Sequence, residues 1–165
     1  GASLINDVTG LRDPEMLEAA LEFNAGIVIM HMRGTPQTMQ QQTYYRDVVA
    51  EVKQYLAEKA GAAQSAGIRQ IIIDPGIGFA KTAAQNFEIL RRLEEFCDLG
   101  YPVLVGPSRK SFLGSLPGGA PPEQRLEAGL AAVTIAALKG ASMVRVHDVR
   151  QCRRALDVVE AVRSA

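Results

Sequence analysis

Polar and charged residues follow short apolar runs at five points along the chain. They are Asn6 and Asp7, residues 31–34, residues 74–76, residues 108–110, and Arg145 with His147 and Asp148. In a parallel α/β fold the carboxyl ends of all strands lie on one rim, and that rim holds the active site. These residues are therefore predicted to converge, although solubility alone also places polar residues at strand ends.

Asp74 directly follows three isoleucines and precedes Pro75, Gly76 and Gly78. A carboxylate there could accept two hydrogen bonds from a planar heterocycle with adjacent N–H donors. It could equally cap the backbone N–H groups of its own turn. The glycines either let the backbone approach a ligand or simply make the turn. The segment is not a dinucleotide-binding G-x-G-x-x-G motif, because the third glycine is absent.

The segment from Ser108 to Ser111 combines two cations with hydroxyl groups after a Gly-Pro pair. It could contact an anion or an aromatic ligand, with Lys110 as a point charge and Arg109 available for bidentate bonding. A solvated basic loop is the alternative. The Gly-Lys-Ser/Thr order of a phosphate-binding Walker A loop is absent.

Arg145 lies within an apolar run, so its side chain is expected either to pair or to face a ligand. His147, two residues later, lies on the same strand face. Such a pair suits a phosphate or pyrophosphate group. His31 and His147 could instead bind a metal with Asp74, but no close ligand spacing supports that interpretation.

Five short apolar runs alternate with helical patterns. Strands are expected near residues 3–5, 27–30, 71–73, 102–105 and 143–146, and helices at 13–24, 44–66, 85–96, 122–138 and 149–162. Continuous Ile/Val runs predict strands covered on both faces, as in a parallel sheet. Five such units indicate either an open doubly wound sheet or part of a (β/α)8 barrel. The helix at 122–138 is apolar nearly all round and is expected to be buried.

The composition narrows the class of protein. Lys plus Arg equals Asp plus Glu, 18 against 18, which argues against a nucleic-acid or anionic-membrane surface. No apolar run approaches the ~20 residues that span a bilayer. Cys97 and Cys152 are predicted to be buried thiols of a cytoplasmic protein. Because Gly1 is not a methionine and a strand pattern begins at once, the chain is expected to be an excised or truncated segment.

Five blocks of the sequence resemble successive blocks of the dihydropteroate synthase family, in family order and spacing. They are residues 1–10 (GASLINDVTG), 30–36 (MHMRGTP), 74–79 (DPGIGF), 106–112 (GPSRKSF) and 145–149 (RVHDV). The family is a (β/α)8 TIM barrel of the α/β class. The resemblance implies that the chain supplies about strands 4–8 with their helices. Residues 1–165 would then be the C-terminal part of a single pterin-binding barrel domain.

The resemblance also implies an activity in folate biosynthesis. Enzymes of this family are transferases that join 6-hydroxymethyl-7,8-dihydropterin diphosphate to p-aminobenzoate, giving 7,8-dihydropteroate and pyrophosphate. By resemblance, Asn6, Asp74 and Lys110 contact the pterin, with Met30, Phe79 and Gly106 as pocket wall; Ser108 and Lys110 flank p-aminobenzoate, where sulfonamides compete; Arg145 and His147 bind pyrophosphate; and Lys110, Arg145 and His147 form the catalytic set.

The family's first three strands have no counterpart here. Their block Asn-x-Thr-Pro-Asp-Ser-Phe-Ser carries the main magnesium ligand, so Mg²⁺ is an expected cofactor with no metal ligand within this chain. The chain is thus expected to be an incomplete barrel with exposed edge strands and doubtful activity alone, and the full-length protein to be a homodimer. Two alternatives are a pterin-binding methyltransferase domain, which should lack the Ser-Arg-Lys loop and the Arg-x-His pair, and a non-catalytic truncated fragment.

Overall fold

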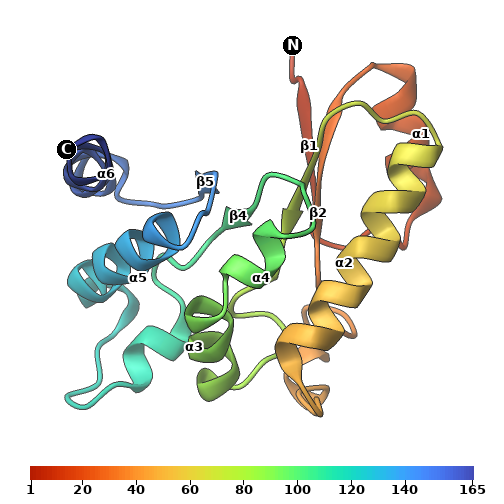
Figure 1. Ribbon diagram of the computed structural model, residues 1–165. Coiled ribbons are helices and arrows are strands. Elements are labelled where there is room, and N and C mark those ends of the chain that lie inside the picture. Colours follow the sequence, from red (N-terminus) through yellow and green to blue (C-terminus); the bar gives the residue numbers. More distant parts are fainter.

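The computed structural model describes all 165 residues and alternates strands with helices (Figure 1). The elements are β1 (Leu4–Asp7), α1 (Pro14–Glu22), β2 (Gly26–Met30), α2 (Val48–Ser65), β3 (Ile71–Asp74), α3 (Ala83–Arg91), α4 (Glu94–Cys97), β4 (Leu104–Val105), α5 (Leu126–Leu138), β5 (Met143–Val144) and α6 (Val149–Ser164). Short 3-10 turns lie at Met39–Gln41, Ser111–Ser115 and Pro122–Gln124. The predicted alternation of strand and helix is confirmed.

The strands are all parallel and lie side by side in the order of the sequence. β1, β2 and β3 form one hydrogen-bonded sheet, and β4 pairs with β5. A parallel bridge between Ile73 and Val103 joins the two groups. Doubly wound sheets reverse their strand order at a switch point, whereas barrel strands follow one another around the sheet. The uninterrupted order therefore favours the barrel.

Strand residues alternate between two faces. Ile27, Ile29 and Ile73 point outward into a core of 23 buried residues that the helices cover. Val28, Ile72 and Leu104 form a separate apolar cluster on the opposite face. That second face, with the strand residues that share it, is called the inner face below. β2 and β3 are buried along their whole length, as their unbroken apolar runs predict.

Side-chain caps fix where the helices begin. Asp13 accepts a hydrogen bond from the Glu15 N–H at the start of α1, with Pro14 at the first helical position. Asp47 accepts from two backbone N–H groups at the start of α2. Thr82 and Gln85 form a reciprocal capping box at α3. These polar residues therefore fix the first residues of α1, α2 and α3 after the loops that follow the strands.

Replacing Asp47 with alanine is expected to lower the free energy of unfolding by about 1–2 kcal/mol, because α2 loses its cap. Arg92, whose guanidinium lies 3.0 Å from the Asp47 carboxylate, also loses a partner. Asp47→Ser keeps an acceptor for the backbone and should lose less than half as much. Urea unfolding of the two variants checks this; equal losses would show that the cap is unimportant.

The helix expected at 85–96 is wrong in one respect, because the structure divides it into α3 and α4. Arg92 leaves helical geometry, with φ −108° and ψ 26°. Its guanidinium donates to Glu88, Glu95 and Asp47 and so ties the two short helices to α2. The chain changes direction at this break, and the Arg92 guanidinium there binds the carboxylates of all three acidic residues.

The helix expected at 122–138 also needs correction. Residues 122–124 form a 3-10 turn, and α5 starts only at Leu126. The break falls at Arg125, whose guanidinium donates to the carbonyl oxygens of Ala120 and Arg109. The prediction of burial on all sides is wrong as well, since Ile135 is 43% and Leu138 is 52% exposed.

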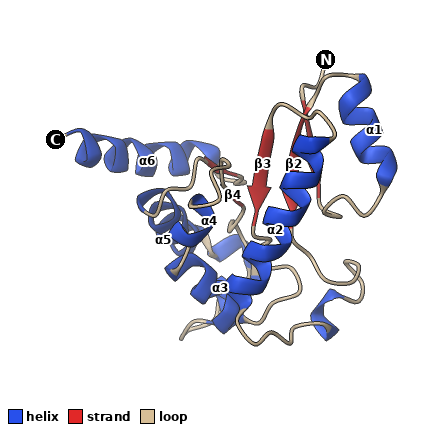
Figure 2. Ribbon diagram, turned by 45° about the vertical axis from the view of Figure 1, so that its right-hand side comes forward, coloured by secondary structure: helices blue, strands red, loops and turns tan.

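The remaining observations concern the two cysteines, the place of α6 and the character of the helices. Cys152 is buried, as predicted, but Cys97 is only half-buried, and both are free thiols. Figure 2 shows α6 at the end of the molecule opposite to α1. None of the helices combines the length and the apolar character that crossing a bilayer requires.

Candidate functional site

The strand ends bring several of the predicted residues to the inner face. Asn6 pairs with Val28 across β1 and β2, and Asp74 pairs with Met30 across β2 and β3. Paired residues of neighbouring strands share a face, so these four side chains line the same side of the sheet. Asn6 is exposed, whereas Met30 and Asp74 are buried.

Asp74 ends β3 and is only 7% exposed. Its Oδ1 atom accepts a hydrogen bond of 2.7 Å from the Gly76 N–H, which confirms the turn-capping interpretation. Burial raises the pKa of Asp74 to about 6, opposed by this hydrogen bond and by the charges of Lys81, Lys110 and Arg145. Oδ2 has no hydrogen bond within the chain. Because no fully buried polar side-chain atom lacks a partner, Oδ2 keeps some exposed surface.

Lys110 reaches back from the β4 loop across the loop that follows β3. Its Nζ lies 3.9 Å from the centre of the Phe79 ring, a cation–π contact. Gly78, with φ +84°, makes room for it: a Cβ there would lie 2.8 Å from Lys110 Cδ. Burial lowers the pKa of Lys110. A cation thus lies over an aromatic ring near the Asp74 carboxylate.

The ends of β4 and β5 are joined through Ser108, which is buried. Its Oγ lies 3.0 Å from His147 Nδ1 and accepts from the His147 backbone N–H. The imidazole is otherwise exposed. Gly106 lies beside Arg145, since a Cβ placed at Gly106 would be in ordinary contact with the Arg145 Cβ at 3.8 Å. Four predicted residues from two loops therefore lie together.

Arg145 departs from the sequence prediction. The strand expected over 143–146 ends at Val144, since β5 has a partner only on its β4 side, although the Arg145 N–H still donates to Val105. The Arg145 side chain is exposed and has no ion pair or hydrogen bond within the chain. Of the two expectations, pairing within the chain is not found, and a ligand as the partner of the guanidinium stays a prediction. Arg109, by contrast, is paired with Asp148 at 3.0 Å.

Lys81 is a buried residue of this region that sequence reasoning missed. Its Nζ lies 3.0 Å from Nδ1 of His31, which is also buried. Burial, and next the Lys81 charge, lower the pKa of His31 to about 2. The only signal in the sequence was a lysine placed between the apolar pair Phe79 and Ala80 and the helix-capping Thr82.

The chain offers no ligand set for a metal ion. No three His, Cys, Asp or Glu side chains lie together in a way that could hold one. The metal interpretation of His31 with His147 and Asp74 fails, because these three side chains do not lie together, and Nδ1 of His31 contacts the ammonium of Lys81. The residues present do not fit the magnesium ion implied by the resemblance, and its requirement stays a prediction.

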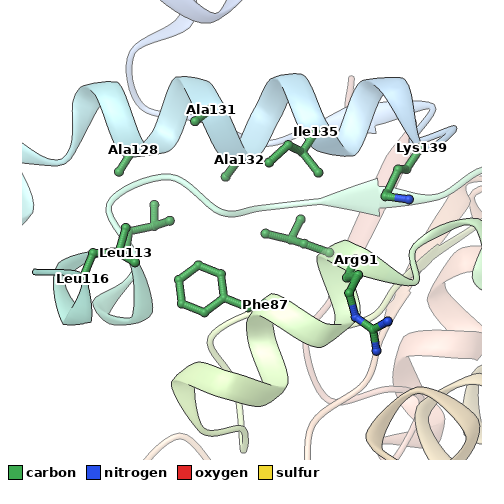
Figure 3. A pocket seen from close by; sticks show the side chains of 10 residues that line it. Phe87, Arg91, Leu113, Leu116, Ala128, Ala131, Ala132, Ile135 and Lys139 are labelled. Atoms are coloured by element: carbon green, nitrogen blue, oxygen red, sulfur yellow. The ribbon is translucent and has the colours of Figure 1, made fainter.

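A large cleft lies elsewhere. A cleft of about 430 Å³ between α3 and α5 is lined mainly by apolar side chains, including Phe87, Leu113 and Ile135, with Arg91 and Lys139 at its edge (Figure 3). It shares no residue with the inner-face site. Volume alone therefore does not locate the chemistry of this molecule.

Comparison with known proteins identifies the family. Residues 1–147 match the family model described as pterin binding enzyme. The chain belongs to the pterin-binding enzyme family. Dihydropteroate synthase of Escherichia coli is 46% identical over 167 residues, which cover 100% of this chain and 59% of that protein. The chain thus spans about three fifths of this relative.

Solved structures agree with the fold. Dihydropteroate synthase from Thermus thermophilus in complex with 4-aminobenzoate is 50% identical, with a TM-score of 0.94 over 98% of this chain and 66% of that one. The enzyme from Xanthomonas albilineans in complex with 7,8-dihydropteroate is 44% identical, with a TM-score of 0.91 over 100% and 62%. The architecture of the chain is accordingly α/β of the TIM-barrel type.

Proposed function

We propose that this pterin-binding chain is part of a dihydropteroate synthase, which condenses 6-hydroxymethyl-7,8-dihydropterin diphosphate with p-aminobenzoate. The observation that carries the proposal is Asp74, a buried carboxylate with one oxygen held by Gly76 and the other accessible. An aminopyrimidine edge presents adjacent N–H donors, which suit an acceptor-only carboxylate. The relatives described above bear the same activity in their names.

The pterin would lie on the inner face. Asp74 accepts hydrogen bonds from the polar edge of the pterin ring, and Asn6 donates to that edge. Met30, Phe79 and Gly106 form the wall of the pocket. Lys110, held over Phe79, contacts both the pterin and the neighbouring p-aminobenzoate. Ser108 marks the other side of the p-aminobenzoate position, where a sulfonamide would compete.

The diphosphate would lie at the ends of β4 and β5. Arg145 is free of partners within the chain, and a guanidinium forms bidentate bonds to phosphate oxygens. His147 has its Nδ1 held by Ser108, which leaves Nε2 for the ligand. These two groups offset the negative charge that grows on the leaving pyrophosphate.

The chemistry requires no covalent intermediate with the enzyme. The C–O bond between the pterin methylene and the diphosphate breaks, and its electron pair leaves with pyrophosphate. The methylene becomes cation-like, and the negative Asp74 carboxylate offsets charge spread into the ring. The amine nitrogen of p-aminobenzoate forms the new C–N bond with its lone pair, and the proton that it loses passes to water. Lys110, Arg145 and His147 form the catalytic set.

The finer architecture belongs to the same proposal. The five strands correspond to strands 4–8 of a (β/α)8 barrel, and residues 1–165 to the C-terminal part of one barrel domain. β1 and β5 each lack a neighbour on one side, which is where further strands would add. The whole protein is proposed to be a cytoplasmic homodimer.

The function is tested by adding 6-hydroxymethylpterin, and then both substrates with Mg²⁺, to the chain. Pterin binding should raise the unfolding free energy by about 2.7 kcal/mol at a ligand concentration 100 times the Kd. Turnover by the chain alone should be weak or absent, whereas a protein that also contains barrel strands 1–3 should form dihydropteroate and pyrophosphate together, as separated by chromatography. No thermal shift at millimolar pterin would favour a non-catalytic fragment. Methyl transfer without pyrophosphate release would favour a methyltransferase domain.

Arg145→Ala is expected to weaken binding of the pterin diphosphate by about 10- to 100-fold, because the diphosphate loses a charged hydrogen-bonding partner. Binding of 6-hydroxymethylpterin, which lacks the diphosphate, should not change. Calorimetric titration of both ligands measures the difference, and Arg150→Ala, an exposed arginine of α6, is the matched control. Equal losses for the two ligands would contradict the assignment of Arg145 to pyrophosphate.

A further inference from the structure

Lys81 lies behind the loop that follows β3 and is 3% exposed. Its Nζ has three acceptors: Nδ1 of His31 at 3.0 Å, the carbonyl of Gly76 at 3.1 Å and the carbonyl of Phe79 at 3.0 Å. An ammonium group carries three N–H donors, so all of them are satisfied. Below the pKa of about 7 to which burial lowers it, Lys81 is therefore held in the fold as a charged group.

His31 completes the arrangement from the β2 side. Its Nδ1 accepts from Lys81, so the ring is neutral with its proton on Nε2. The ring packs edge-on against Tyr55, with centroids 5.0 Å apart. The His31 backbone N–H donates to the Asp74 carbonyl, and Gly76 lies against the His31 carbonyl. Lys81 is therefore hydrogen-bonded to a histidine that is itself held by packing and by backbone contacts.

The loop that Lys81 holds carries the proposed pterin contacts. Asp74 precedes it, and Phe79, which lies under Lys110, is bonded to Lys81 through its own carbonyl. The charge of Lys81 also acts on Asp74, together with those of Lys110 and Arg145. The groups acting on Lys81 itself are Asp74 and, from the β2 loop, Arg33. His31, being neutral, adds no charge.

We propose that Lys81 is a positioning residue for the pterin site: its ammonium clamps the 76–79 turn and supplies a buried positive charge that keeps the Asp74 carboxylate ionised. This inference rests on the proposed function only for the identity of the ligand. The clamp and the charge effect are properties of the free protein.

The first test needs no ligand. In protein labelled with ¹³C at aspartate, the Asp74 carboxyl signal is titrated by NMR for the unmodified chain, Lys81→Gln, Lys81→Arg and the control Lys53→Gln. Loss of the Lys81 charge should raise the Asp74 titration midpoint by about one pH unit or more. Lys81→Arg and Lys53→Gln should leave it in place. An unchanged midpoint in Lys81→Gln would overturn the proposal.

If Lys81→Gln does not fold, the Asp74 titration midpoint of the Lys81→Arg variant tests the proposal instead. If the folded arginine variant raises the midpoint despite keeping the charge, the proposal is wrong. If it keeps the midpoint while the glutamine variant is unfolded, buried charge is what the loop requires.

The second test measures pterin affinity at pH 6, below the pKa of about 7 to which burial lowers Lys81. Lys81→Gln should bind 6-hydroxymethylpterin about fivefold more weakly, because fewer molecules hold Asp74 ionised. Unchanged affinity in Lys81→Gln, with normal binding by the unmodified chain, would contradict the role of Lys81. Failure of the unmodified chain to bind would reject the pterin function, and the NMR titration would still decide on Lys81.

Discussion

Asp74→Asn is expected to reduce pterin affinity by 100-fold or more. The amide keeps one oxygen, which Gly76 already occupies in the native turn, and turns an NH₂ donor toward the N–H groups of the ligand. Losing two hydrogen bonds to a charged acceptor costs about 1.5–3 kcal/mol each. Titration of 6-hydroxymethylpterin at pH 8, where the native carboxylate is ionised, measures the loss. Asp98→Asn, an exposed carboxyl, is the control.

The same substitution should stabilise the fold. The pKa of Asp74 in the folded state, about 6, lies above its ordinary value of 3.8. Between these values the folded protein holds a proton that the unfolded chain has lost, so the free energy of unfolding falls as pH rises from about 4 to 6. Above pH 6 the ionised carboxylate costs about 3 kcal/mol. The neutral amide of the Asp74→Asn variant carries no such cost, and the variant should gain about 1–3 kcal/mol at pH 7.5.

The comparison must be made between the variant and the unmodified chain at each pH. The lowered pKa of His31 acts in the opposite direction, since its protonation below about pH 6 favours the unfolded state. The difference between the two urea-unfolding curves removes that contribution. A difference that is independent of pH from 4 to 8 would show that burial does not perturb Asp74.

Gly76→Ala is expected to destabilise the fold by more than about 3 kcal/mol. Gly76 has φ +70°, a conformation that costs an alanine energy, and its Cβ would overlap the carbonyl oxygen of His31. Backbone cannot move aside as a flexible side chain can, so the turn must open. Circular dichroism during thermal unfolding should show a strongly lowered Tm.

Gly61→Ala provides the matched control. Gly61 lies within α2, and a Cβ there meets nothing within 4 Å. Alanine should raise the unfolding free energy by about 0.5–1 kcal/mol, because it is the better helix former. A Gly76 variant as stable as the native chain would mean that the turn has another conformation of similar energy.

The strand and helix pattern was readable because it depends on local composition. Unbroken isoleucine and valine runs identified β2 and β3, and Asp13, directly before Pro14, identified the start of α1. The break at Arg92 was not readable, since it depends on carboxylates brought from α2 and α4. Tertiary partners of this kind leave no periodic signal.

The candidate site was readable only in part. The position of Asp74 after a strand indicated a carboxylate at the rim, but the sequence could not tell turn cap from ligand acceptor. The structure shows the cap on one oxygen and leaves the other without a partner in the chain, so the ligand role stays a prediction. Lys81 escaped notice because its partners, His31 and two backbone carbonyls, lie 50, 5 and 2 residues away. Burial of a lysine is a property of the folded chain.

The alternation of faces along β3 has a consequence for how this site can evolve. Ile73 packs into the helix-covered core, while its neighbour Asp74 belongs to the inner face. Adjacent residues of β3 thus serve two separate requirements: packing of the core on one side of the sheet, and the proposed recognition of the ligand on the other. Variation that remodels the ligand pocket can accumulate at every second strand position while the helix-covered core retains its packing.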